Sequence, residues 1–140
     1  NMNILVIDAQ GGGIGRQLVT KLLERIPEAD IVAAGTNSMA TNAMIKAGAK
    51  KAATGENAIR YCASQAEIIT GPIGILVANA MLGEISPAIA ESVGSSTAPK
   101  VLIPTAHCNT IIAGTKALPV KDSIEDAVDR IVRIHGGEDN

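Results

Sequence analysis

The first 26 residues constrain the fold more than any other stretch, because their hydrophobic pattern changes abruptly at a run of glycines. Residues 4–7 are four consecutive apolar residues, without the alternation of a half-exposed strand. Such a run is typical of a strand buried on both faces, as in parallel sheets flanked by helices. Across residues 14–26 the apolar positions recur at helical spacing. The pattern predicts a buried strand, a glycine turn and an amphipathic helix in succession.

The glycine turn between these two elements is suited to hold an anion. Its glycines have no side chains, so the backbone N–H groups can approach a ligand closely. The first turn of the next helix adds unpaired N–H groups and the positive end of the helix dipole. The first candidate cofactor-binding residues are therefore Gly11, Gly12, Gly13, Ile14 and Gly15.

Two later loops are expected to complete a ligand crevice. Residues 29–35 predict a second strand, and Thr36 and Asn37 follow it where a dinucleotide fold contacts the adenosine ribose. No acidic residue, which would favour NAD, stands there, and the same polar residues could instead cap the next helix. Gly71 and Pro72 follow a predicted strand at residues 66–70 and would face the glycine turn. A plain turn is the alternative interpretation of residues 71–74.

The rest of the chain alternates between predicted strands and helices. Further strands are expected at residues 51–53 and 101–103, with a sixth at 111–114, and helices at 38–47, 57–65, 75–85, 86–93 and 123–135. Ser123 with Asp126 predicts a capping box at the start of the last helix. We expect one α/β domain over residues 2–140, a Rossmann-like three-layer sandwich with a mainly parallel sheet of about five strands. Asn1, which precedes Met2, is interpreted as a cloning remnant.

Composition narrows the classes of function. Hydrophobic residues make up 46% of the chain, yet it has no Phe or Trp, one Tyr and a net charge of −2. Without stacking aromatics or a basic stripe, nucleic-acid binding is not expected. The longest nearly apolar run, residues 73–82, is too short to span a bilayer, so no membrane partner is expected. Two distant cysteines and two histidines favour a cytoplasmic protein without a metal centre.

Residues 75–85 are the most apolar region and predict a helix. Ile75, Ala78, Leu82 and Ile85 recur at helical spacing, and other apolar residues lie between them. A helix that is apolar nearly all round is either buried or covered by another subunit. We therefore expect a homo-oligomer, such as a homodimer, through residues 73–85.

The glycine turn fits known phosphate-binding motifs only in part. The dinucleotide fingerprint Gly-x-Gly-x-x-Gly, anchored on Gly15, has Gln10 at its first glycine. The short-chain-dehydrogenase variant Gly-x-x-x-Gly-Ile-Gly fits better, with Ala9 at its first position, but no Tyr-x-x-x-Lys pair is present. The P-loop motif fails, because Arg16 and Gln17 replace its lysine and hydroxyl residue. NAD or NADP is the favoured cofactor.

Two side chains are weak candidates for catalysis. Asp8 ends the first strand beside the expected anion site and would repel a pyrophosphate there. Its alternative role is to accept hydrogen bonds from the N–H groups of the glycine turn. Cys108 follows a strand end, where a cysteine among polar neighbours can be a nucleophile. The adjacent His107 is poorly placed as its base, because neighbours on an extended segment point apart, and a structural role for Cys108 is the alternative.

Taken together, short motifs across the chain resemble a family of anaerobic bacteria that is classed only as a domain of unknown function. The motifs are Asp8-Ala9-Gln10-Gly11-Gly12-Gly13-Ile14-Gly15, Gly35-Thr36-Asn37, Ala53-Thr54-Gly55-Glu56-Asn57-Ala58-Ile59, Gly71-Pro72-Ile73-Gly74 and Cys108-Asn109. The resemblance covers nearly the whole chain, although family members typically have glycine in place of Ala9. It implies one intact bacterial domain and no established activity.

Three hypotheses follow for the function. The leading one is a protein that binds a nucleotide or a dinucleotide of the NAD(P) type at residues 9–16, as an oxidoreductase or a sensor. The second is a small cysteine-dependent enzyme that uses Cys108. The third is a non-catalytic oligomeric adaptor that acts through residues 73–85.

Overall fold

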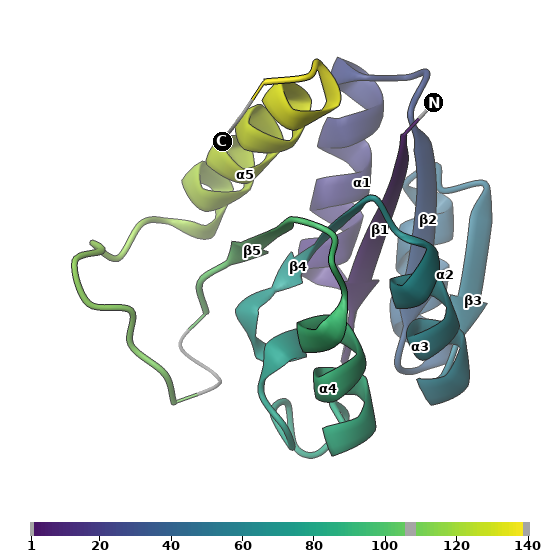
Figure 1. Cartoon of the computed structure of the whole chain (residues 1–140), viewed down its shortest axis with the longest axis vertical. Coiled ribbons are helices and arrows are strands. Elements are labelled where there is room, and N and C mark those ends of the chain that lie inside the picture. Colours follow the sequence, from purple (N-terminus) through teal and green to yellow (C-terminus); the bar gives the residue numbers. More distant parts are fainter. Residues whose placement is uncertain (1, 106–108, 139–140) are drawn as a thin grey trace.

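The computed structural model describes residues 2–105 and 109–138, in which strands and helices alternate along the chain (Figure 1). The elements are β1 (Asn3–Asp8), α1 (Gly13–Arg25), β2 (Asp30–Gly35), α2 (Ser38–Lys46), β3 (Lys51–Thr54), α3 (Glu56–Gln65), β4 (Ile68–Pro72), the 3₁₀ helix η1 (Ile73–Leu76), α4 (Pro87–Ser95), β5 (Lys100–Ile103) and α5 (Val120–His135).

The strands of the described residues form one parallel five-stranded sheet in the order β3-β2-β1-β4-β5. β1 is central, and its Ile4 lies beside Ile31 of β2 on one side and Ile68 of β4 on the other. In this Rossmann-like order the strand sequence reverses between β1 and β4, which is where open α/β sheets bind ligands. The α/β fold predicted from the sequence, with its parallel sheet, is confirmed.

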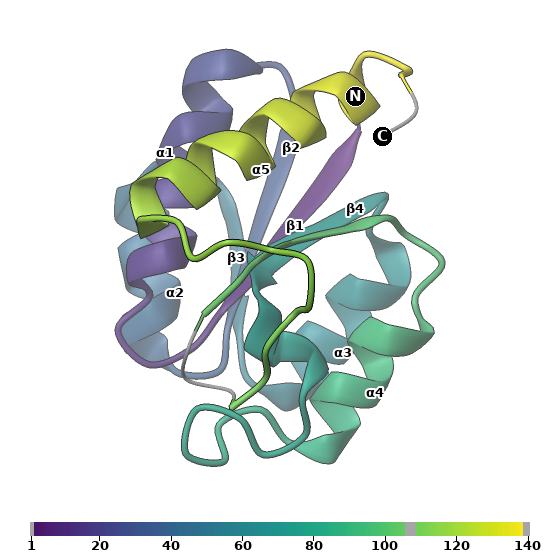
Figure 2. The same cartoon turned by 90° about the vertical axis from the view of Figure 1, so that its left-hand side faces the viewer.

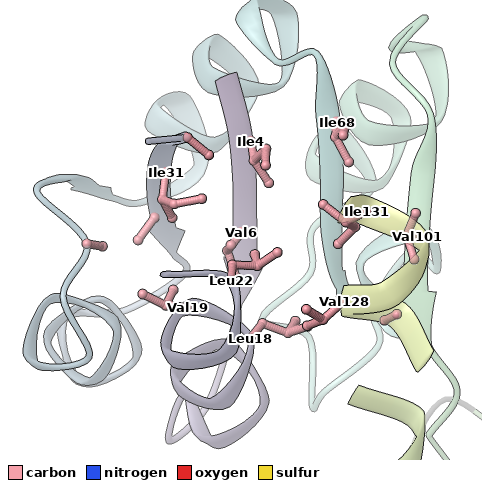
Figure 3. Close-up of a cluster of buried hydrophobic side chains, with 14 of the residues drawn as sticks. Ile4, Val6, Leu18, Val19, Leu22, Ile31, Ile68, Val101, Val128 and Ile131 are labelled. Atoms are coloured by element: carbon pink, nitrogen blue, oxygen red, sulfur yellow. The ribbon is translucent and has the colours of Figure 1, made fainter. Parts of the chain in front are cut away.

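Helices cover both faces of the sheet, so the central strand is buried on each side (Figure 2). On the face of α1, α2 and α5, Ile4 and Val6 pack with Leu18 of α1 (Figure 3). On the face of α3 and α4, Leu5 and Ile7 join a second core cluster. All four β1 side chains are fully buried, and each such burial stabilises the fold by roughly 1.5–3 kcal/mol. The unbroken apolar run at residues 4–7 is explained by these two cores.

The helix predicted at residues 75–85 is wrong. Only η1 is helical there, and the chain then passes through turns in which Asn79, Met81 and Leu82 have φ of 66°, 56° and 58°. These left-handed conformations cannot continue a right-handed helix. Ile75 and Ile85 are fully buried in the second core cluster. These two side chains therefore fix the two ends of a loop to the core of the same subunit. Self-association through residues 73–85 stays a prediction.

Two further predictions for the C-terminal third are also wrong. Residues 111–114 form no strand, and Ile111 is 94% exposed in a loop between β5 and α5. The last helix begins at Val120 rather than Ser123, with Pro119 as its N-cap residue and no side-chain cap. Asp126 pairs with Arg130 one turn later, at 2.9 Å, instead of closing a capping box.

Helix α5 owes its position to one apolar stripe. Its buried residues are Ile124, Ala127, Val128 and Ile131, which pack into the core cluster on the α1 face. The rest of its surface is largely charged or polar. Across residues 2–105 and 109–138, no helix has both the length and the apolar character that a bilayer crossing demands.

Gly71 provides a test of the contact between the two strands at the reversal point. A Cβ atom at this position would lie 2.2 Å from the backbone oxygen of Ile7, so β1 and β4 would have to move apart. We expect Gly71→Ala to lower the free energy of unfolding in urea by about 2–4 kcal/mol. Gly11→Ala is the matched control, because a Cβ there meets nothing within 4 Å. A loss below about 0.5 kcal/mol for Gly71→Ala would contradict this packing.

Candidate functional site

A cavity of about 220 Å³ lies at the carboxyl ends of β1 and β4, beside the start of α1. We call it the glycine-turn cavity. Its lining comes from the glycine turn, from the end of β4 and from two loops: Asp8, Ala9, Gln10, Gly11, Gly12, Gly13, Ile14, Pro72, Met81 and Thr105. It therefore forms at the reversal point of the strand order, where this class of sheet places its ligands.

The glycine turn is shaped by two residues with positive φ. Gln10 has φ of 50° and Gly12 has φ of 72°, and the Gly12 N–H donates to the oxygen of Ala9 at 3.0 Å. A side chain at position 12 would meet the backbone of Ala40 in α2 at 2.8 Å. Glycine is required there by both the backbone conformation and the contact with α2.

The carboxylate of Asp8, at the end of β1, holds the glycine turn by hydrogen bonds. Its Oδ1 accepts from the N–H of Ala9 at 2.8 Å and its Oδ2 from the N–H of Gly15 at 2.7 Å. Burial raises the pKa of the Asp8 carboxyl above its ordinary value, and the nearby charge of Glu84 raises it further. Hydrogen bonds from the N–H groups of Gly15, Ala9 and Ile14 lower the pKa but do not outweigh these effects. The interpretation of Asp8 as a hydrogen-bond acceptor for the glycine turn is confirmed.

Gly15 makes this contact with Asp8 possible. A Cβ atom at position 15 would lie 2.9 Å from the Cβ of Asp8 and 2.7 Å from the Sδ of Met44. Only glycine lets the first turn of α1 approach the end of β1 so closely. Gly15 therefore supports the turn but does not line the glycine-turn cavity. The other four predicted turn residues do line it.

Two N–H groups of the turn remain available. Among the described residues, the N–H groups of Gly11 and Gly13 have no hydrogen-bond acceptor. A Cβ atom at either position would meet nothing within 4 Å, so both residues border open space. Gly13 is the first residue of α1, where the unpaired N–H groups and the helix dipole favour a negative charge. These two N–H groups can hold an anion.

Glu84 is a site residue that the sequence did not reveal. Its Oε1 accepts from the N–H of Gln10 at 2.8 Å, from Oγ1 of Thr36 at 2.6 Å and from Nδ2 of Asn37 at 2.8 Å. Burial would raise the pKa of Glu84, but the three hydrogen bonds outweigh it and hold the pKa below its ordinary value. An acidic group thus lies beside the end of β2 after all, supplied by the loop before α4. No local signal could have found it, because the residues it binds are 47 to 74 positions away.

The predicted site residues fall into separate groups. Asn37 is the N-cap of α2, and its Oδ1 accepts from the N–H of Ala40 at 2.9 Å, so the alternative cap role is confirmed. Cofactor binding by Thr36 and Asn37 stays a prediction. Pro72 lines the glycine-turn cavity, whereas Gly71 is buried in β4 and does not. Cys108 lies outside the described residues, and its role in catalysis stays a prediction.

A larger hollow of about 510 Å³ adjoins the glycine-turn cavity, and both are lined by Ile14 and Thr105. We call it the apolar hollow. Its walls come mainly from the loop between β5 and α5: Ile14, Ile73, Pro104, Thr105, Thr110, Ile111, Ile112, Thr115, Lys116, Ala117, Leu118, Val120 and Ser123. An apolar group attached to an anion in the glycine turn could extend into it.

Metal ligation has little support in the described part of the chain. No three His, Cys, Asp or Glu side chains gather there as a metal site requires. Asp8 directs both its carboxylate oxygens to backbone N–H groups.

The buried carboxyl of Asp8 makes a prediction about pH. Because its pKa is higher in the folded protein than its ordinary value of 3.8, the folded state binds more protons than the unfolded state just above that value. Stability contributed by this group therefore grows as the pH falls from 7 toward 4. In urea titrations, the difference in unfolding free energy between wild type and Asp8→Asn should shift in favour of the wild type over this range.

Asp122→Asn, at an exposed position of α5, is the control for loss of a carboxylate. A difference between wild type and Asp8→Asn that stays constant, or that moves toward the variant as the pH falls, would contradict the account of Asp8.

Comparison with known proteins gives a family and a fold. No curated protein matches the chain. An FMN-dependent Ubix-like decarboxylase from Escherichia coli O157:H7, a dodecamer, is similar with a TM-score of 0.51 and 16% identity over 99% of this chain and 96% of that one. Saccharopine dehydrogenase from Saccharomyces cerevisiae has a TM-score of 0.48 and 14% identity, covering 91% of this chain and 24% of that one. AibC has a TM-score of 0.47 and 14% identity, covering 99% of this chain and 43% of that one. The profile of a domain of unknown function, DUF3842, matches residues 3–136, and the chain belongs to that family.

Proposed function

We propose that this protein binds a nucleotide whose phosphate lies on the free N–H groups of Gly11 and Gly13. The main support for the proposal is that these two N–H groups border the glycine-turn cavity and have no acceptor among the described residues. Backbone N–H groups at a helix N-terminus are a common phosphate site. The reversal point of a parallel sheet is the usual ligand crevice of such folds.

The neighbouring hollow supports a nucleotide over a bare anion. Ile14 lines both spaces, so a ligand that leaves the glycine turn in that direction meets Ile73, Ile112 and Leu118. Apolar walls suit the flat ring of a base, a nicotinamide or a flavin. NAD, NADP and FMN are therefore the ligand classes to test, FMN also because the similar E. coli decarboxylase depends on it.

The charges around the turn set an upper limit on affinity. None of the described residues that line the glycine-turn cavity is Lys or Arg, and the carboxylates of Asp8 and Glu84 lie nearby. Three N–H groups partly compensate Asp8. Two hydrogen bonds from N–H groups to a phosphate contribute on the order of 3–6 kcal/mol. Inorganic phosphate alone should therefore bind with a Kd in about the millimolar range, and the ring should supply the remaining affinity of a nucleotide.

Gly13→Asp tests the proposal without disturbing the helix. An acidic residue in the first turn of α1 is favourable for the helix dipole, and the space at this position is open. The new carboxylate would compete with the ligand's phosphate for the same N–H groups. We expect titration calorimetry with NAD, NADP, FMN and AMP to show a ligand for the wild type, and Gly13→Asp to bind it at least about tenfold more weakly, with an unchanged or higher melting temperature.

Gly13→Ala is the matched control, since it keeps the N–H group and adds no charge. It should bind the same ligand nearly as the wild type does, and should be more stable by about 0.4–1 kcal/mol. Absence of binding by the wild type to every nucleotide, or equal binding by Gly13→Asp, would contradict the proposed function.

A further inference from the structure

On the side of the crevice next to β2, a carboxylate of the protein binds the available hydrogen-bond donors, and we infer that Glu84 limits the site to a ligand with one nucleoside. The inference rests on the proposed function and specifies its ligand. A phosphomonoester with a single ring system needs only the glycine turn and the two spaces toward β5. A dinucleotide such as NAD or FAD also needs the β2 side, for its second nucleoside.

The hydrogen-bond donors at the end of β2 are already used. In a dinucleotide fold the ribose of the adenosine half lies just beyond this strand. Here the hydroxyl of Thr36, the side-chain amide of Asn37 and the N–H of Gln10 all donate to one oxygen of Glu84, at 2.6–2.8 Å. In dinucleotide folds an acidic side chain at this point accepts from the ribose hydroxyls. The Oε1 of Glu84 is instead occupied by three donors of the protein, and hydrogen bonds to a charged group are the strong ones.

The loop that carries Glu84 is anchored on both sides of it. Ala80 and Ile85 are buried in the second core cluster, and Ile85 is fully buried. The N–H of Asn79 donates to the oxygen of Ile85 at 2.7 Å and closes the loop on itself. Ser86 then caps α4 by accepting from the N–H of Ile89. The burial of Ile85 therefore holds the backbone of Glu84 beside the end of β2.

The opposite side of the glycine turn has room. The glycine-turn cavity of about 220 Å³ meets the apolar hollow of about 510 Å³ at Ile14 and Thr105. A ligand with its phosphate on Gly11 and Gly13 can therefore extend toward β5 but not toward β2. The charge of Glu84 further disfavours a second phosphate group on the β2 side.

Two matched pairs of ligands test this limit. FAD is FMN with an added AMP unit, and NAD is NMN with the same addition. We expect isothermal titration of the wild-type protein to show at least one mononucleotide of these pairs bound about tenfold or more tighter than its dinucleotide. In Glu84→Ala the donors of Thr36, Asn37 and Gln10 become free, and the ratio of the two affinities should fall at least about fivefold.

Glu91→Ala is the control, because it removes the same charge from an exposed position of α4 and should leave the ratio unchanged. A wild-type protein that binds NAD or FAD as tightly as NMN or FMN overturns the inference and leaves the proposed function standing. An unchanged ratio in a folded Glu84→Ala protein also overturns it. Failure of these four ligands, and of NADP and AMP, to bind the wild type overturns the proposed function itself.

Discussion

The hydrogen bonds from Asp8 to the glycine turn are the contact on which the rest of the site depends. One carboxylate oxygen holds the residue that follows β1 and the other holds the third residue of α1, so strand and helix are joined across the turn. Each such bond to a charged group is worth about 1.5–3 kcal/mol. The same contact explains the glycine at position 15, where a side chain would collide with Asp8. It also leaves Gly11 and Gly13 with unused N–H groups.

Two carboxylates thus divide the crevice into parts with different chemistry. Asp8 lies underneath and shapes the turn, while Glu84 binds the donors on the β2 side. Between the glycine turn and β5 lie two adjoining spaces. One is bordered by free N–H groups and the other mainly by apolar side chains, with Lys116 also in its wall. This arrangement favours a ligand with a negative group at one end and a flat apolar body at the other. The direction in which such a ligand extends follows from Glu84 rather than from the fold, since the fold alone would allow both directions.

The sequence predicted those parts of the molecule that depend on local patterns. The run at residues 4–7 and the helical stripe after the glycines identify a buried strand and its helix. A strand buried on both faces has consecutive apolar residues, whereas a helix buried along one stripe has them at intervals of three or four residues. The cap role of Asn37, which the sequence offers as the alternative to a ribose contact, is also a local pattern, since capping acts over three residues. The helix prediction at residues 75–85 failed because Ile75 and Ile85 are separate anchors of a loop whose left-handed residues leave no apolar signature. Glu84 could not be predicted, because the residues it binds lie far away in the chain and meet it only in the folded protein.

Hydrogen exchange of four backbone N–H groups, measured by NMR, tests the central claim most directly. If Asp8 binds the turn as described, the N–H groups of Ala9 and Gly15 exchange slowly, while those of Gly11 and Gly13 exchange rapidly in the free protein. Addition of a nucleotide that binds should then slow the exchange at Gly11 and Gly13. Equal and strong protection of all four N–H groups in the free protein would contradict the account, because the turn would then have no donors left for a ligand.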